Sequence, residues 1–115
     1  IVREQLMSFG LNIIEASSAE EAEQLIQNIP HLNLLISDVW LQGVSAGPIL
    51  AEQFAEQAND RIILLMSGYT HNVLIDGSQG ILTFPLLRKP FDKEALYNAL
   101  LQAKQGLNRE EFHDQ

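Results

Sequence analysis

The sequence contains no cysteine among its 115 residues. Disulfides, thiolate nucleophiles and cysteine-based zinc sites are therefore excluded, and the absence fits a reducing compartment, so we expect a cytoplasmic location. Lysine and arginine are also scarce: they number 7, against 15 aspartate and glutamate residues, which gives a net charge of −8. Contacts with nucleic-acid phosphates or with an anionic membrane surface need clustered basic side chains, so we expect neither partner.

Long apolar runs are missing as well. No stretch approaches the roughly 20 residues that cross a bilayer, and no signal peptide is visible, so we expect no membrane contact. The first residues lack an initiator methionine and a helix cap, so we expect the chain to be part of a longer polypeptide. The length suits one domain, and the 46% of apolar residues is typical of a globular protein.

Apolar periodicity predicts helices and strands that alternate with short connections. A first helix carries Val2, Leu6 and Phe9 on one face and ends at Gly10, and a strand follows over residues 11–16. The next helix begins at the capping box of Ser18 and Glu21 and ends at Pro30, and a strand follows over 34–38. A helix over 47–57 has Pro48 in its first turn, and its residues Ile49, Leu50 and Phe54 are predicted to face inward. A strand over 62–66 and a short helix over 70–75 follow. The last strand covers 81–88 and is paired only after Pro85, because proline cannot donate to a ladder. The last helix is capped by Asp92 and ends at Gly106.

This alternation predicts an α/β fold, a doubly wound parallel sheet with helices on both faces. Strands 34–38 and 62–66 are apolar nearly throughout, so we expect both to be central strands that are covered on both sides. We place the domain at residues 1–105 and expect residues 106–115 to form a polar tail or linker.

Polar side chains stand at the ends of three of the predicted strands. Asp38 ends the strand over 34–38, Ser67 follows the strand over 62–66, and Lys89 follows Leu86–Arg88. Open α/β sheets bind ligands at the carboxyl ends of their strands, so we expect these three side chains to face one another. A carboxylate, a hydroxyl and an ammonium suit the handling of a phosphoryl group, because phosphoryl transfer needs positioning and neutralisation of charge.

Three motifs at these strand ends resemble the receiver domain of two-component signalling, and in detail the receivers of hybrid sensor histidine kinases. They are Asp38-Val39-Trp40-Leu41-Gln42-Gly43, Ser67-Gly68-Tyr69-Thr70 and Leu86-Leu87-Arg88-Lys89-Pro90-Phe91. Each motif alone is a weak signal, whereas three in order at the ends of the right strands are specific. The resemblance covers residues 1–105 and implies the flavodoxin-like receiver fold.

The resemblance implies a role for each matching residue. Asp38 would be the phosphoacceptor, a carboxylate nucleophile toward a phosphohistidine or a small phosphodonor. Ser67 and Lys89 would contact oxygens of the phosphoryl group, and Gly68 would allow close approach of the backbone. The peptide bond between Lys89 and Pro90 would be cis.

The resemblance also implies Mg²⁺ as cofactor, with the Asp38 carboxylate and the backbone carbonyl of Trp40 as ligands. Receivers complete this site with an acidic pair that follows a first strand. The given chain starts within the next helix, so the first strand and the pair are absent from it. Two protein ligands would hold Mg²⁺ weakly, because the ion keeps its waters and needs several oxygens.

The implied partners are a histidine kinase, in the same polypeptide or in another, and a histidine phosphotransfer protein. Receivers also dimerise or dock through one face, which here would include Val73, Leu74, Arg88 and Tyr97. As a signalling module, such a domain promotes its own phosphorylation and dephosphorylation without turning over an outside substrate.

Two other classes of function remain open at this point. A degenerate receiver would act only as a protein-protein interaction module, and the absent acidic pair favours this reading. A flavodoxin-like enzyme that binds a nucleotide or cofactor would need a glycine-rich or Ser/Thr-rich phosphate loop after the first strand. No such loop is visible in the sequence.

Overall fold

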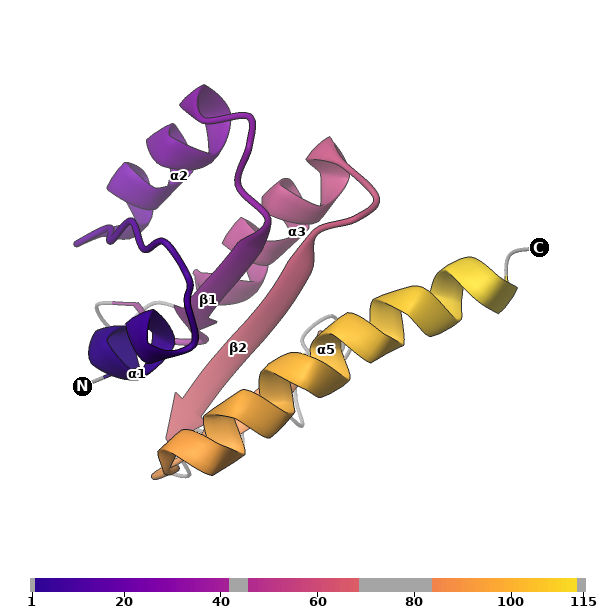
Figure 1. Cartoon of the computed structure of the whole chain (residues 1–115). Coiled ribbons are helices and arrows are strands. Elements are labelled where there is room, and N and C mark those ends of the chain that lie inside the picture. The colour runs from indigo at the N-terminus through magenta and orange to yellow at the C-terminus, as the bar shows by residue number, and fades with distance from the viewer. Residues whose placement is uncertain (1, 42–45, 69–83, 114–115) are drawn as a thin grey trace.

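The computed structural model describes residues 2–41, 46–68 and 84–113 (Figure 1). In chain order, its elements are α1 (Val2–Ser8), α2 (Ala19–Asn28), β1 (Leu34–Asp38), α3 (Gly47–Gln57), β2 (Ile62–Gly68), β3 (Leu86–Lys89) and α5 (Lys93–His113). The three strands form one sheet in the order β1-β2-β3, and both neighbouring pairs run parallel. The predicted α/β fold with a parallel sheet is therefore confirmed.

Helices cover both faces of this sheet. The strand β2 turns alternate side chains to opposite sides, so its apolar residues pack against helices on both faces. On one face, Ile63 and Leu65 pack with Leu50 and Phe54 of α3 and with the helix α2. On the other face, Leu64 packs with α1 and α5. Phe54, Leu64 and Leu65 are almost completely buried, so the apolar pattern of the sequence is satisfied on both sides of β2.

Local signals set three helix ends where the sequence predicted them. The Ser18 hydroxyl accepts a hydrogen bond from the Glu21 N–H at 3.1 Å and caps α2. The Asp92 carboxylate accepts one from the Ala95 N–H at 2.8 Å and caps α5. Gly10, just after α1, has a φ of 86°, a left-handed conformation that glycine adopts without steric cost.

Four sequence predictions are wrong in detail. Residues 11–16 are extended but form no strand, because they have no ladder with a described strand. β1 is an edge of the described sheet and is only half-buried, so it is not a central strand. Ile49 is 58% exposed because it faces away from the sheet. α5 continues through Gly106 to His113, since one glycine costs a helix only about 1 kcal/mol.

Some predictions concern residues outside the described part of the chain. They are the short helix over 70–75 and the beginning of the last strand at residues 81–83. The paired part of that strand, after Pro85, is confirmed as β3. Within the described ranges, no helix has the length and apolar character that would let it span a membrane.

Candidate functional site

The candidate site lies at the carboxyl edge of the sheet, where the predicted polar residues come together. Asp38 is the last residue of β1 and Lys89 is the last residue of β3, while Ser67 lies next to last in β2. The register aligns Asp38 with Met66 and Gly68 with Lys89, so the strand ends lie side by side. Parallel pairing thus gathers residues that are about 50 positions apart in the sequence.

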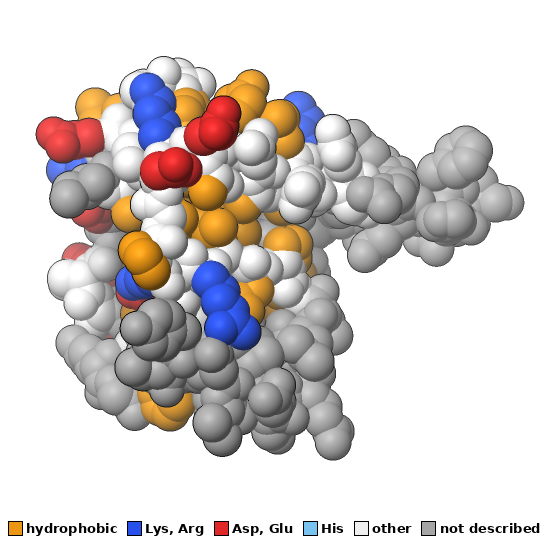
Figure 2. Space-filling view, turned by 90° about the horizontal axis from the view of Figure 1, so that it is seen from below, with side chains coloured by type: hydrophobic (Ala, Val, Ile, Leu, Met, Phe, Trp, Pro, Cys, Tyr) orange, Lys and Arg blue, Asp and Glu red, His pale blue; other side chains and the backbone are white. Residues whose placement is uncertain are grey.

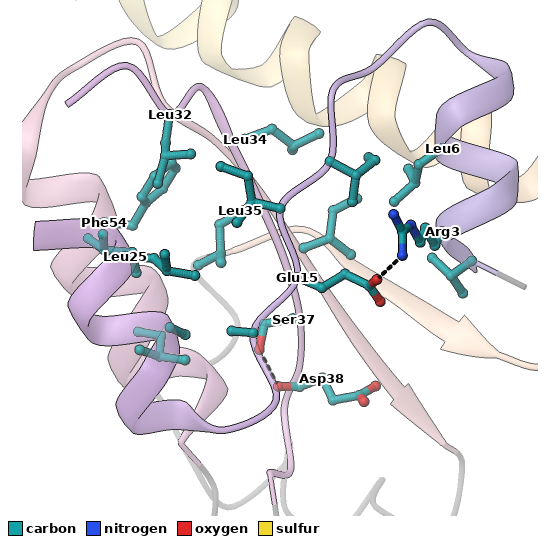
Figure 3. Close-up of a pocket in the computed structure, with 18 of the residues that line it drawn as sticks. Arg3, Leu6, Glu15, Leu25, Leu32, Leu34, Leu35, Ser37, Asp38 and Phe54 are labelled. Atoms are coloured by element: carbon teal, nitrogen blue, oxygen red, sulfur yellow. Dashed lines mark hydrogen bonds and ion pairs between the residues drawn. The ribbon is translucent and has the colours of Figure 1, made fainter. Parts of the chain in front are cut away.

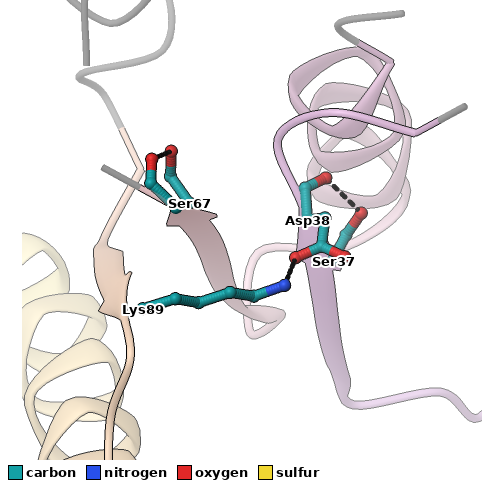
Figure 4. A network of polar contacts seen from close by, with 5 residues as sticks. Ser37, Asp38, Ser67 and Lys89 are labelled. Atoms are coloured by element: carbon teal, nitrogen blue, oxygen red, sulfur yellow. Dashed lines mark hydrogen bonds and ion pairs between the residues drawn. The ribbon is translucent and has the colours of Figure 1, made fainter. Parts of the chain in front are cut away.

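Lys89 reaches across the end of β2 to Asp38 (Figure 4). Its Nζ atom lies 2.6 Å from Asp38 Oδ1, and the two side chains are 43% and 38% exposed. Oδ1 itself is closed off from solvent. The remaining atoms of both side chains are partly exposed to water, and a partly exposed ion pair stabilises a fold by no more than about 1 kcal/mol. The Lys89–Pro90 peptide bond is cis, as the resemblance implied.

Ser67 is almost completely buried, and its hydroxyl donates a hydrogen bond to the Gly68 carbonyl at 3.0 Å (Figure 4). The structure therefore joins Lys89 to Asp38 directly, whereas the Ser67 hydroxyl is directed to its own neighbour. A hydroxyl can rotate about its Cβ–Oγ bond at little cost. Ser67 is thus positioned at the edge without a contact to Asp38.

The backbone behind Asp38 is held by contacts that the sequence did not predict. The Ser37 hydroxyl donates to the Asp38 carbonyl at 2.9 Å, and the Val39 N–H donates to the Met66 carbonyl at 2.8 Å. The N–H of Gly47, the first residue of α3, donates to the Val39 carbonyl at 3.1 Å.

Gly47 approaches this backbone more closely than any other residue type could. A Cβ atom at Gly47 would overlap the Asp38 carbonyl oxygen and lie 2.9 Å from the Val39 Cα. Glycine therefore lets the start of α3 pack against the turn that follows the phosphoacceptor candidate. A glycine directly before Pro48 was the available signal for this close approach, although from the sequence we predicted only a helix start there.

The metal-ligand predictions concern Asp38 and Trp40. Trp40 is half-buried, two residues beyond Asp38, and packs against the core on the α2 and α3 face. Within the described ranges, no three acidic, histidine or cysteine side chains cluster in a way that could hold a metal ion. The described donors are thus one carboxylate and backbone carbonyls, a set that suits a Mg²⁺ ion that keeps most of its waters and is held weakly.

The fold is shared with solved receiver structures. A response regulator receiver protein from Sinorhizobium medicae WSM419 matches with a TM-score of 0.75 and 22% identity over 90% of this chain and 82% of that chain. A response regulator receiver domain protein from Clostridium thermocellum matches with a TM-score of 0.69 and 20% identity over 96% of this chain and 86% of that one. This chain therefore has the flavodoxin-like receiver fold.

Sequence comparison matches the chain to part of a bacterial transcriptional regulatory protein. This chain is 31% identical over 97 residues to the transcriptional regulatory protein GlrR of Escherichia coli (strain K12). The match takes in 84% of this chain but only 21% of the length of GlrR. No protein-family model matches the sequence. The resemblance to the receivers of hybrid sensor histidine kinases stays a prediction.

Proposed function

We propose that this receiver domain is the phosphoacceptor of a two-component phosphorelay and takes a phosphoryl group onto Asp38. The observation that carries the proposal is the ion pair of Asp38 and Lys89 at the carboxyl edge, where Nζ and Oδ1 are 2.6 Å apart. A carboxylate nucleophile and a mobile cation lie at one exposed edge, with a hydroxyl in reach of the same edge. This is the set of groups that phosphoryl transfer requires.

In the proposed reaction, a carboxylate oxygen of Asp38 attacks the phosphorus of a phosphohistidine. The new O–P bond forms as the N–P bond breaks, and the histidine nitrogen keeps the electron pair of the broken bond. The product is an acyl phosphate on Asp38. The pair with Lys89 engages Oδ1, so Oδ2 is the oxygen that we propose as the nucleophile.

Lys89 and Ser67 would stabilise the phosphoryl group. The Lys89 ammonium would move from Asp38 Oδ1 to a phosphoryl oxygen, because the acyl phosphate has lost the charge on the carboxylate while the phosphoryl oxygens carry charge. The Ser67 hydroxyl would turn from the Gly68 carbonyl to a second oxygen. Gly68 has no side chain at the edge, which leaves room for the phosphoryl group to approach the backbone.

Mg²⁺ is the cofactor that we propose, with the Asp38 carboxylate and the Trp40 carbonyl as its ligands in this chain. When bound, the ion supplies charge that neutralises oxygens of the transferring group. Because these are few ligands, we expect weak binding unless oxygen donors outside residues 1–115 complete the site.

We further propose a cytoplasmic histidine kinase as the phosphodonor, in the same polypeptide or in another, with a histidine phosphotransfer protein as a further partner. The face proposed for docking or homodimerisation includes Arg88 and Tyr97, which are exposed. Its other two members, Val73 and Leu74, lie outside the described residues. If charge substitutions at Arg88 and Tyr97 leave kinase docking and self-association unchanged, this part of the proposal is wrong.

The test is the intact mass of the protein after incubation with Mg²⁺ and acetyl phosphate. We expect one phosphoryl adduct that disappears in Asp38→Asn and persists in Asp60→Asn, a matched change in an exposed turn. The same measurement on a chain extended upstream separates two cases. An adduct only in the extended chain means that the metal site needs further ligands. No adduct in either chain would contradict the proposal.

A degenerate receiver that only binds other proteins is the second candidate. It is favoured by the lack, within the described ranges, of a cluster of metal-ligating side chains. This candidate predicts that Asp38→Asn binds partner proteins as well as the unchanged chain does.

A further inference from the structure

Ser37 carries a buried hydroxyl to which the proposed reaction gives no role. It is 8% exposed and lies directly before Asp38, in a strand whose other residues are leucine and isoleucine. Its register partner in β2 is Leu65, which is completely buried. An apolar residue would suit such a position, because a buried hydroxyl is costly unless it finds a partner. The partner of the hydroxyl therefore indicates its role.

That partner is the backbone of the next residue. The Ser37 hydroxyl donates to the Asp38 carbonyl at 2.9 Å (Figure 3). The ring that this hydrogen bond closes contains the N–Cα and Cα–C bonds of Asp38, and rotation about these two bonds is the main freedom of a residue's backbone. The bond therefore restricts the backbone of the residue that carries the candidate nucleophile.

Two further contacts hold the peptide group between Asp38 and Val39. The Val39 N–H donates to the Met66 carbonyl at 2.8 Å, which anchors the group to β2. Gly47, the first residue of α3, packs so closely against the Asp38 carbonyl oxygen that a Cβ atom there would overlap it. The three contacts together fix the plane of this peptide group, and with it the direction in which the Asp38 side chain leaves the backbone.

Ser37 itself lies below the edge at which a phosphodonor would bind. In the register of the sheet it is level with Leu65, two residues deeper than Ser67, which corresponds to about 6–7 Å. On the side of the molecule toward which the strands run, charged side chains of both signs are exposed (Figure 2). The Asp38 and Lys89 side chains are 38% and 43% exposed, whereas Ser37 is buried. Any effect of Ser37 on the reaction must therefore pass through the backbone.

We propose that Ser37 is a positioning residue for phosphoryl transfer and acts on Asp38 through the backbone. The proposal rests on the proposed function of Asp38 as the phosphoacceptor. With the hydroxyl in place, the carboxylate starts each attack from one fixed position beside Lys89. Without it, the backbone of Asp38 rotates more freely, so fewer bound donors meet a correctly placed nucleophile. Because Ser37 contacts no donor, its loss lowers the maximal rate and leaves the half-saturating donor concentration unchanged.

The test compares Ser37→Ala with Ser37→Thr in the full chain. Threonine keeps the hydroxyl, and Ser37 lines a cavity of about 520 Å³ beside β1, so the extra methyl group has space (Figure 3). We expect Ser37→Ala to lower the maximal rate of phosphoryl uptake from acetyl phosphate about tenfold and Ser37→Thr to restore most of it. Ile26→Val, which removes one methylene from the core of α2, is the control for a small general loss of stability and should leave the rate unchanged.

Amide hydrogen exchange gives a second readout that does not depend on phosphorylation. Ser37→Ala should speed exchange of the Val39 N–H by at least about threefold, because the peptide group that it belongs to is held less firmly. The Ile62 N–H, which donates to the Asn33 carbonyl at the other end of the same strand pair, is the internal reference and should not change. Ser37→Thr should exchange like the unchanged chain at both positions.

Unchanged exchange at Val39 in Ser37→Ala would overturn the proposal, and so would a maximal rate of phosphoryl uptake equal to that of the unchanged chain. A fall in rate that Ser37→Thr does not reverse, or that Ile26→Val shares, would overturn it as well, because it would reflect packing alone. If the unchanged chain takes up no phosphoryl group, the proposed function fails instead. The exchange of Val39 then still decides whether Ser37 fixes the backbone at Asp38.

Discussion

Lys89 Nζ and Asp38 Oδ1 lie 2.6 Å apart although the two residues end strands that do not touch each other. β2 separates β1 from β3, and the lysine side chain is long enough to cross its carboxyl end. The pair connects the two outer strands of the described sheet at the one edge where the polar residues gather. Its exposure suits a contact that is exchanged during a reaction more than one that holds the fold.

Replacement of the Lys89 ammonium should therefore affect chemistry more than stability. We expect Lys89→Ala to lower the rate of phosphoryl uptake from acetyl phosphate by at least about tenfold, since a lost contact to a transferring group typically costs more than that. The free energy of unfolding should change by less than about 1 kcal/mol. Intact-mass kinetics and urea denaturation measure the two effects. Lys104→Ala, an exposed change on α5, is the control and should alter neither.

Two glycine substitutions should change stability in opposite directions. Gly47→Ala places a Cβ against the Asp38 carbonyl oxygen, so α3 or the turn must shift, at a cost of about 1–3 kcal/mol. Gly106→Ala meets nothing within 4 Å in α5 and should stabilise by up to about 1 kcal/mol. Urea denaturation of both variants checks the signs. If both substitutions changed the free energy of unfolding by the same amount and with the same sign, the close approach at Gly47 would be contradicted.

Neighbouring residues of α3 give a matched test of its buried face. Leu50 is 4% exposed and Ile49 is 58% exposed. Leu50→Ala should destabilise the fold by about 2–5 kcal/mol, because it leaves a cavity in the core. Ile49→Ala should change the free energy of unfolding by less than about 0.5 kcal/mol. Thermal unfolding measures the loss of stability in both variants. A larger loss in Ile49→Ala than in Leu50→Ala would mean that α3 is rotated about its axis.

Stability should depend on the ionisation of Glu21. The Ser17 N–H donates to its carboxylate at 2.6 Å, and this bond, aided by the Ser17 hydroxyl, lowers the pKa of Glu21. Because the pKa of Glu21 is lower in the folded state than in the unfolded state, its ionised carboxylate adds to the free energy of unfolding at pH values above the ordinary carboxyl pKa. This contribution is lost as pH falls through the folded-state pKa.

Between neutral pH and about pH 3, the free energy of unfolding should therefore fall less in Glu21→Gln than in the unchanged chain. Urea midpoints at the two pH values measure the difference. Glu20→Gln, an exposed change in the same first turn of α2, should keep the full pH dependence. If the two variants show the same pH dependence of stability, the Ser17 contact does not contribute to that dependence.

Local chemistry explains which elements could be predicted. The bounds of α3 and the caps at Ser18 and Asp92 depend on contacts within about one helical turn, so short sequence patterns determine them. The candidate site was predictable in outline because parallel strands bring their carboxyl ends to one edge. The approach of Gly47 to Asp38 was not predicted, since it depends on how α3 docks on the turn.

The sequence by itself determined the alternation of helices and strands, the apolar faces of β2 and the set of side chains that reach the carboxyl edge. It also favoured an extended conformation for residues 11–16. Only the tertiary structure decided that this segment has no ladder with a described strand, that β1 is an edge strand of the described sheet, and that Lys89 rather than Ser67 contacts Asp38. Propensity and patterning act over a few neighbouring residues, whereas strand pairing and side-chain contacts across a sheet depend on which distant segments are present to meet them.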